Sequence, residues 1–181
     1  MKVLLISANI FTEPYAVYPL GLDYVAKASE KDHKVKIADR NDLNHSDSIK
    51  EVIKTFLPDI IGISIRNIDN TDTADAKGFI NSYKKLVDRI RNYTKSPIVL
   101  GGSGFTIFPA EILEALQADY GIIGEGERFS LLLNAIVRKE DVSSIPGVIT
   151  REKNAPIPQP LDKPFAAPID TNNSHLNFYL E

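Results

Sequence analysis

The chain has 181 residues, of which 43% are hydrophobic and 25% are charged, and this length suffices for one domain with a substantial core plus an extension. Its net charge is −3, so the chain lacks the excess of Lys and Arg that marks nucleic-acid-binding proteins. No apolar run approaches the ~18 residues that a membrane span requires. Because cysteine is absent, disulfides, thiolate catalysis and cysteine-held metal clusters are excluded within these residues.

The N-terminal segment MKVLLISANIF contains a short apolar run, residues 3–6, that predicts a first strand. No small-residue cleavage site follows this run, so the segment lacks the pattern of a secretory signal peptide. We therefore expect a cytoplasmic protein whose partners include neither nucleic acid nor a membrane.

Short apolar strands and amphipathic helices alternate along the first 140 residues. In chain order we expect a strand at 3–6, a helix at 20–30, a strand at 33–39, a helix at 48–56, a strand at 59–65, a helix at 74–93, a strand at 97–100, a helix at 110–117, a strand at 120–123 and a helix at 126–139. Helices between consecutive strands provide the crossover connections that parallel strands need. The pattern predicts an α/β fold, a Rossmann-like (flavodoxin-like) parallel sheet of five strands with helices on both faces.

The pattern changes after residue 140. GVIT (147–150), the polar turn REKNA and the following PIP predict a small hairpin, and residues 159–181 carry three prolines in a polar stretch without periodicity. We therefore divide the chain into a domain at 1–140, a hairpin extension at 141–158 and a linker or arm at 159–181.

The loops that follow the strands are the candidate binding elements. In an open parallel sheet, ligands bind beyond the carboxyl ends of the strands, where the strand order reverses. The loops at 7–21 and 64–73 are long, and those at 101–106 and 124–128 are rich in glycine. Because all four open on the same edge of the sheet, a ligand that contacts all of them must be large.

Three common ligand classes of such folds do not fit these loops. A dinucleotide requires G-x-G-x-x-G after the first strand, where the first glycine is Gly21, although Asp39 resembles the acid that binds ribose. A P-loop requires a Gly-Lys-Ser/Thr ending, which is absent. A phosphoacceptor receiver domain requires an Asp that closes the third strand and a Lys after the fifth, and this chain has neither.

The glycine-rich loops also have a purely structural interpretation. Gly101 and Gly102 can turn the chain after a strand, with Thr106 as the N-cap of the next helix. Glu125 and Glu127 can interact favourably with the positive end of the helix that follows them. Spacing alone leaves both interpretations open, and the gathering of enlarged loops at one edge favours a ligand.

No residue of the chain has the pattern of a metal ligand or a catalytic group. The three histidines, His33, His45 and His175, lie in polar segments, as solvated histidines do. We therefore predict no metal ligand and no catalytic acid, base or nucleophile within these residues.

Four segments carry a resemblance to a known family. They are YPLGLDYVAKA (18–28), LPDIIGISIRN (57–67), PIVLGGSGFTIFPAEIL (97–113) and DYGIIGEGERFSLLL (119–133), and IPGVITR (145–151) follows them in the same order. Together they resemble the N-terminal cobalamin-binding domain of cobalamin-dependent radical S-adenosylmethionine enzymes, over about residues 1–151.

This resemblance implies that the carboxyl edge of the sheet binds cobalamin, with the nucleotide tail near the GG strand and the corrin ring over the loops. Small residues leave space for the tail, and the amide N–H groups of residues 102–105 suit phosphate and carboxamide oxygens. The cofactor-binding residues expected are Tyr18, Pro19, Ser64, Arg66, Asn67, Gly101, Gly102, Ser103, Gly104, Phe105, Thr106, Gly124, Glu125, Gly126 and Glu127. Two expectations test this: Gly102→Val weakens cobalamin retention more than stability, and neither Phe105 nor Tyr18 plugs the rim.

The loop after the first strand lacks the Asp-x-His-x-x-Gly motif by which cobalamin domains of the methionine synthase and mutase type give cobalt a histidine ligand. The corresponding segment, residues 7–21, contains no histidine. We therefore expect cobalamin to bind with its own base detached and without an imidazole from this chain. Residues 66–68 or 15–18 would then face the lower side of the corrin.

The family's radical domain holds an iron–sulfur cluster and S-adenosylmethionine through a cysteine triad, and the chain has no cysteine. We therefore expect the chain to stop before a downstream catalytic barrel and to bind cobalamin without turnover. Methyl transfer is one reaction that the resemblance implies for the whole enzyme. The alternative is a flavodoxin-like interaction or regulatory module that does not bind cobalamin.

Overall fold

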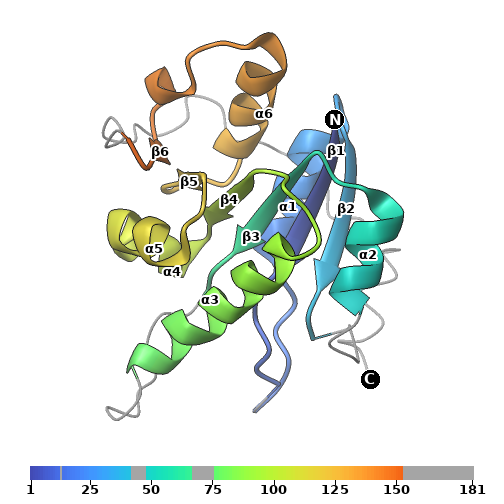
Figure 1. The fold of residues 1–181 in the computed structure, drawn as a ribbon, viewed down its shortest axis with the longest axis vertical. Helices are drawn as coiled ribbons and strands as arrows, with labels where there is room; N and C mark the ends of the chain where they lie inside the picture. The colour runs from blue at the N-terminus through green and yellow to red at the C-terminus, as the bar shows by residue number, and fades with distance from the viewer. Residues whose placement is uncertain (13, 42–47, 67–75, 153–181) are drawn as a thin grey trace.

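The computed structural model describes residues 1–12, 14–41, 48–66 and 76–152. Its centre is a six-stranded sheet with the strand order β2-β1-β3-β4-β5-β6 (Figure 1). The strands are β1 (Lys2–Ser7), β2 (Lys34–Asp39), β3 (Ile60–Ser64), β4 (Ile98–Gly101), β5 (Tyr120–Ile122) and β6 (Val148–Thr150). The helices are α1 (Leu20–Glu30), α2 (Ser48–Phe56), α3 (Ala76–Arg91), α4 (Ser103–Ile107), α5 (Pro109–Leu116) and α6 (Arg128–Arg138), and η1 (Val142–Ser144) is a 3-10 turn.

Strands β1 to β5 are parallel, which confirms the predicted α/β fold. The order 2-1-3-4-5 is the one typical of flavodoxin-like sheets, and in such sheets the strand order reverses between β1 and β3. The connection after β1 runs through α1 to one side, and the chain later returns to the other side of β1 to form β3. The carboxyl ends of β1 and β3 therefore flank the expected binding crevice.

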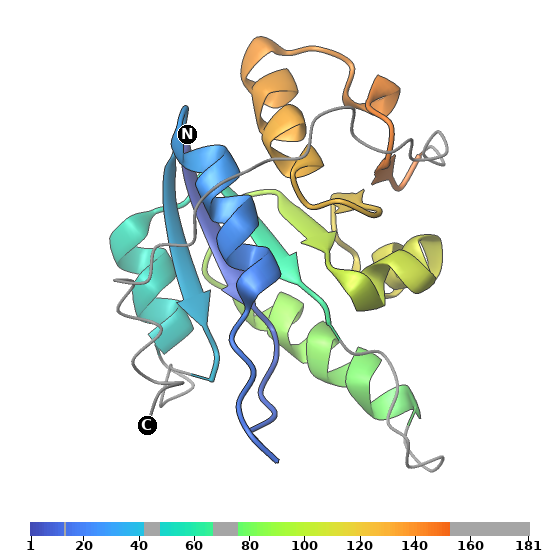
Figure 2. The ribbon, with the colours of Figure 1, turned by 180° about the vertical axis from the view of Figure 1, so that it is seen from behind.

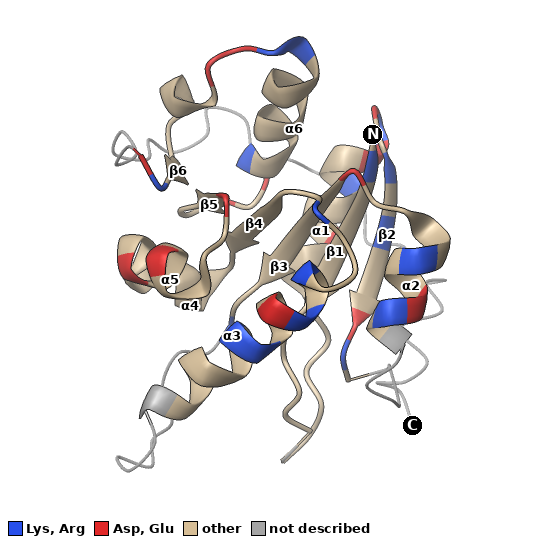
Figure 3. Ribbon diagram, viewed as in Figure 1, with Lys and Arg blue, Asp and Glu red and all other residues tan. Residues whose placement is uncertain are grey.

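Each face of the sheet carries its own core, because successive side chains of a strand point to opposite faces. Leu4 and Ile6 of β1 belong to the core under α2, α3, α4 and α5, whereas Val3 and Leu5 belong to the core under α1 and α6. Figure 1 shows α3 in front of the sheet, and Figure 2, seen from behind, shows α1 in front. Strands β3 and β4 carry no charged residue, as expected for strands covered on both faces (Figure 3).

The sixth strand joins the main sheet, which was not predicted. Residues 148–150 form β6 as expected of a strand, but β6 pairs antiparallel with β5, with Ile122 opposite Val148. It therefore extends the main sheet beyond five strands. The second half of the predicted hairpin and the arm at 159–181 lie outside the described residues, so the proposed division at 141–158 stays a prediction.

The segment after β4 also differs from its prediction. Residues 103–107 form the short helix α4, and Thr106 lies within it rather than at the N-cap of the next helix. Phe108 occupies that N-cap, with Pro109 in the first turn of α5. Among the described residues, no helix combines the length and the apolar character needed to cross a bilayer.

Asp119 joins three elements at the amino edge of the sheet and provides a first stability prediction. Its carboxylate accepts hydrogen bonds from the Ile98 amide at 2.8 Å and from Arg91, and pairs with Arg151 at 3.1 Å. We expect Asp119→Ala to lower the free energy of unfolding by about 2 kcal/mol, because a partly buried amide and two cations lose their acceptor. Urea unfolding measures this change.

The control for this prediction is Glu140→Ala. Glu140 and Arg138 are mostly exposed and lie 3.9 Å apart, so we expect this variant to change the free energy of unfolding by less than about 0.5 kcal/mol. Equal effects of the two substitutions would show that the Asp119 contacts add no more than an ordinary surface pair.

Candidate functional site

A cleft of about 730 Å³ opens at the carboxyl edge of the sheet, where the order of the strands reverses. Its floor is formed by β1, β3 and β4, and its walls by α1 on one side and by α6 with the β5–α6 loop on the other. The cleft lies on the α1/α6 face of the sheet, because its floor residues Leu5 and Val99 belong to the core on that face.

A row of small residues forms the outer floor of the cleft. Ser7, Ser64 and Gly101 stand side by side on β1, β3 and β4 in the parallel register. Alternation along the strands places all three on the α1/α6 face. A Cβ atom at Gly101 would meet only Ile122, at 3.8 Å, which is ordinary contact, so the space in front of this residue is open. The row leaves the cleft wide at its mouth.

The inner floor is closed more tightly. Gly62 lies one step further in, between Leu5 and Val99 in the register. A Cβ atom at Gly62 would lie 2.7 Å from Leu5 Cδ2 and 3.4 Å from Phe129 Cζ, so glycine is needed for Leu5 to pack there. The cleft therefore narrows from a small-residue mouth to an apolar end.

The two walls meet where α1 passes the β5–α6 loop. Val25 of α1 lines the cleft, and its Cγ2 atom would lie 2.5 Å from a Cβ atom at Gly126. Glycine at this position lets the loop approach the helix closely. Tyr18 and Pro19, just before α1, complete this wall near the mouth.

Gly102 has a different function from its neighbour Gly101. It adopts φ 99° and ψ 170°, a region essentially restricted to glycine, and a Cβ atom there would lie 2.5 Å from the Ile65 carbonyl oxygen. The glycine therefore allows the loops after β3 and β4 to lie against each other. This overturns the basis of the expected Gly102→Val result, because the substitution strains the fold as well as the cleft.

Contacts between these two loops also engage some of the donors expected to face a ligand. The Gly104 amide donates to the Ile65 carbonyl oxygen at 3.0 Å. It is therefore not available to bind a ligand, contrary to the prediction. The Ser103 hydroxyl donates to the carbonyl oxygen of Arg66 at 3.2 Å. Helix α4 has only five residues, and its first turn serves to join β3 and β4.

Thr106 connects the two glycine-rich loops. Its hydroxyl donates to the Gly102 carbonyl oxygen at 3.1 Å and accepts from the Gly124 amide at 3.2 Å. Gly124 itself has a positive φ of 79° and lines the cleft. Thr106 therefore positions a residue of the cleft without lining it.

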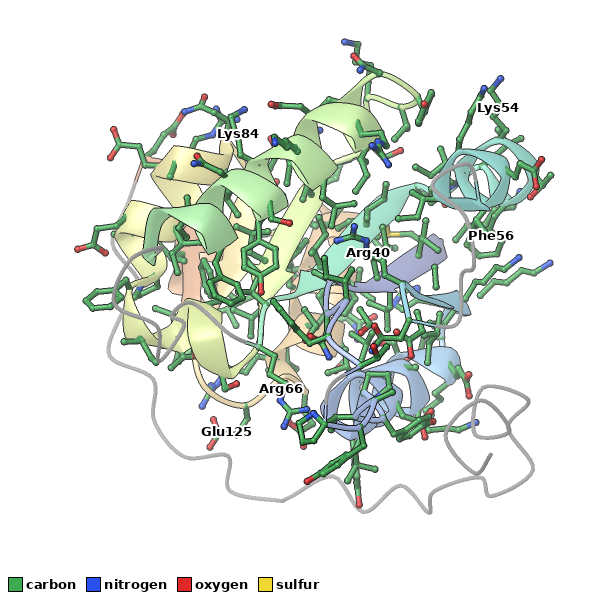
Figure 4. All side chains as sticks on the ribbon, turned by 90° about the horizontal axis from the view of Figure 1, so that it is seen from below. Arg40, Lys54, Phe56, Arg66, Lys84 and Glu125 are labelled. Carbon is green, nitrogen blue, oxygen red and sulfur yellow. The ribbon has the colours of Figure 1, made fainter. Side chains whose placement is uncertain are left out.

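Charge at the mouth comes from Arg66 and Glu125, which Figure 4 shows on the same edge of the molecule. Arg66 lines the cleft with an exposed side chain. Hydrogen bonding from its own backbone amide and from Arg128 lowers the pKa of Glu125 below its ordinary value. Among the described residues, the cleft is thus lined by the cation Arg66, the Glu125 carboxylate next to it is bonded to Arg128, and the interior is mainly apolar.

Nine of the residues predicted from the sequence line this cleft: Tyr18, Pro19, Ser64, Arg66, Gly101, Gly102, Ser103, Gly124 and Gly126. Phe105 does not, since it is fully buried in the core of the opposite face, where its ring packs against Gly121 of β5. Tyr18 is part of the wall, so neither aromatic residue plugs the rim. Gly104, Thr106, Glu125 and Glu127 lie next to lining residues, and Asn67 lies outside the described residues.

Several lining residues were not predicted from the sequence: Ser7, Leu22, Val25, Gly62, Ile122 and Phe129. The apolar ones have the same spacing as core residues, so periodicity did not distinguish a cleft from a core. Gly62 did carry a signal, because a glycine inside a buried apolar strand often marks a close approach of other groups.

Histidine is absent from the described part of the cleft. His33 precedes β2 at the amino edge, where burial and the nearby N-terminal amine lower its pKa. His45 and His175 lie outside the described residues. Among the described residues, no group of three or more His, Cys, Asp or Glu side chains is placed to hold a metal ion.

A family model described as B12 binding domain matches residues 6–133. That range contains the end of β1, all of β2 to β5 and most of the residues that line the cleft. It therefore matches more than half of the chain and includes the region that forms the site.

Two curated proteins and one solved structure show where such a domain occurs. The chain is 34% identical over 151 residues to an uncharacterized methyltransferase of Pyrococcus horikoshii, and the matched region covers 79% of this chain and 30% of that protein. It is 28% identical over 155 residues to tryptophan 2-C-methyltransferase of Streptomyces laurentii, covering 81% of this chain and 25% of that protein. The structure of the radical S-adenosylmethionine methyltransferase TsrM from Kitasatospora setae, with cobalamin and a 4Fe–4S cluster bound, superposes with a TM-score of 0.71 at 28% identity, covering 82% of this chain and 27% of that one. The chain thus spans a quarter to a third of these relatives' length.

Proposed function

Because the chain belongs to the B12-binding domain family, we propose that it is the cobalamin module of a larger radical S-adenosylmethionine enzyme and that the cleft between α1 and α6 receives the cofactor's nucleotide tail. The observation that carries this proposal is the row Ser7, Ser64 and Gly101, which leaves the carboxyl edge open at the reversal of strand order. A cleft of about 730 Å³ is of the size that binds a large organic group.

The residues present fit such a group. Apolar walls from Val25, Ile122 and Phe129 suit a flat aromatic base, and removal of their surface from water favours its entry. The hydroxyls of Ser7 and Ser64 face the same space and can bond polar atoms of the tail. A side chain larger than hydrogen at Gly101 would occupy the mouth.

Bound cobalamin supplies a cobalt centre that carries a methyl group or assists radical chemistry. This chain's residues bind and orient the cofactor, and we assign none of them a catalytic role. The radical, the iron–sulfur cluster and S-adenosylmethionine belong in this proposal to a downstream barrel of the same protein. Methyl transfer by that whole protein is supported by the names of the relatives, all methyltransferases.

The proposal includes cobalamin bound with its own base detached and without a protein imidazole. The support is the composition of the loop after β1, residues 7–21, which has no histidine. Of the histidines, His33 is placed at the far edge of the sheet.

The experiment is retention of hydroxocobalamin. Purified protein is mixed with the cofactor and desalted, and we expect corrin absorbance in the visible spectrum at about one cofactor per chain. After reduction to Co(II), we expect an electron paramagnetic resonance spectrum without nitrogen hyperfine splitting. A spectrum with that splitting contradicts the detached base or the absence of a protein imidazole. Complete loss of corrin on desalting contradicts cobalamin binding and favours the interaction or regulatory module.

A further inference from the structure

Arg128 is the only buried Lys or Arg among the residues that the structure describes, with 2% of its surface exposed. Removing a guanidinium from water costs several kcal/mol unless bonded partners offset it. The residue stands at the first position of α6, directly before Phe129 of the cleft wall. The hydrogen-bond partners of its guanidinium group must therefore offset the cost of burying the charge.

The two ends of the guanidinium bind two different parts of the chain. Its Nη2 group donates to Glu125 Oε2 at 3.0 Å, and its Nη1 group donates to the Pro146 carbonyl oxygen at 3.0 Å. A planar fork of rigid donors can hold both acceptors at once, whereas the single ammonium of lysine lacks this geometry.

One of these partners belongs to the wall of the cleft. Glu125 stands between Gly124 and Gly126, which both line the cleft. The carbonyl oxygen of Gly126 accepts from the Phe129 amide at 2.9 Å, so the loop and the first turn of α6 are one hydrogen-bonded unit. The Glu125 carboxylate is charged at neutral pH, and hydrogen bonds from its own backbone amide and from Arg128 lower its pKa further below the ordinary value.

The other partner belongs to the segment that enters β6. Gly147 has φ 82°, and a Cβ atom there would lie 2.8 Å from Arg128 Cδ and 2.9 Å from the Ile123 carbonyl oxygen. Its carbonyl oxygen accepts from the Ile123 amide at 2.8 Å. Glycine thus lets the chain cross directly over the arginine stem on its way into the last described strand.

We propose that Arg128 is a positioning residue that fixes the β5–α6 loop in the cleft wall and ties it to the segment entering β6, so that cofactor release and opening of that segment are coupled. The part concerning the cofactor rests on the proposed function, and the mechanical link between the two segments does not. The bonds to Glu125 and to the Pro146 carbonyl oxygen run from the wall of the cleft to the C-terminal side of the domain.

The test compares Arg128→Met and Arg128→Lys with the wild type. We expect Arg128→Met to release bound hydroxocobalamin at least tenfold faster, and Arg128→Lys to give an intermediate rate because it keeps the charge but not the fork. In the protein without cofactor, we expect amide hydrogen exchange of Arg128→Met to rise together at residues 123–126 and 147–148. Amides of β1 and β3 keep the wild-type rates.

Two further variants separate positioning from loss of stability. Arg138→Met removes an arginine from the exposed end of the same helix, and Ile53→Val reduces the core on the opposite face. We expect both to leave the release rate within about twofold of the wild type. The proposal fails if Arg128→Met releases cobalamin no faster than these variants, or if its exchange rises uniformly over the sheet. If the wild type binds no cobalamin, the exchange measurement alone decides the link, and the proposed function fails separately.

Discussion

Gly101→Leu is expected to weaken cobalamin binding by about a hundredfold or more, equivalent to ~2.7 kcal/mol, while the free energy of unfolding changes by less than about 1 kcal/mol. The reason is that a side chain here extends from β4 onto the α1/α6 face, between Ser64 and the Ile122 wall. The backbone of Gly101 needs no positive φ, and its nearest neighbour would be 3.8 Å from a Cβ atom. Titration with hydroxocobalamin and urea unfolding measure the two quantities.

The matched control is Ala115→Leu. Ala115 is exposed on α5, which covers the opposite face of the sheet, so the same apolar bulk is added far from the cleft. We expect its cobalamin affinity to equal that of the wild type. If Gly101→Leu binds cobalamin as tightly as this control, the tail does not pass over the Ser7, Ser64 and Gly101 row.

The fold was predictable because its signal is periodic and repeated. The strands β1 to β5 and the helices between them are each long or apolar enough to show their spacing, and their alternation leaves few topologies. Strand β6 has three residues, and its spacing does not say whether it pairs with its sequence neighbour or with β5. Helix α4, of five residues, is likewise too short to show a helical period.

The site was predictable only where backbone chemistry marked it. Gly101, Gly102, Gly124 and Gly126 were identified because glycine in a loop after a strand indicates a turn or a close approach. Phe105 was predicted at the site as the last of the residues 102–105 whose amides suit polar oxygens, but the turn of α4 directs its ring into the opposite core. The direction in which a side chain points from such a short helix depends on the tertiary path of the chain rather than on the local spacing of apolar residues.

Two neighbouring glycines in one loop can also be required for different physical reasons, and the sequence does not distinguish these reasons. Gly101 leaves space for a group outside the chain, whereas Gly102 leaves space for the chain itself. The loop of three glycines therefore joins a binding function to a structural one. Substitutions at the two positions should separate these functions cleanly.

Gly102→Ala is expected to lower the free energy of unfolding by about 3 kcal/mol or more, a larger loss than that expected for Asp119→Ala. The backbone at φ 99° and ψ 170° is strained for any residue with a side chain, and the added Cβ atom lies 2.5 Å from the Ile65 carbonyl oxygen. The nearest atoms that this Cβ would meet all belong to the Ile65 backbone, so no flexible side chain can move aside and the β3 and β4 loops must separate. Urea unfolding measures the loss.

Gly124→Ala is the control that isolates the steric part of this effect. Gly124 also has a positive φ, 79°, but nothing lies within 4 Å of a Cβ atom built there. We expect it to cost about 1 kcal/mol, the conformational term alone. The difference between the two variants then measures the clash with the Ile65 backbone together with the rarer backbone conformation of Gly102. Equal losses would mean that the clash with the Ile65 backbone is relieved without cost, and that the loops after β3 and β4 are not pressed together at Gly102.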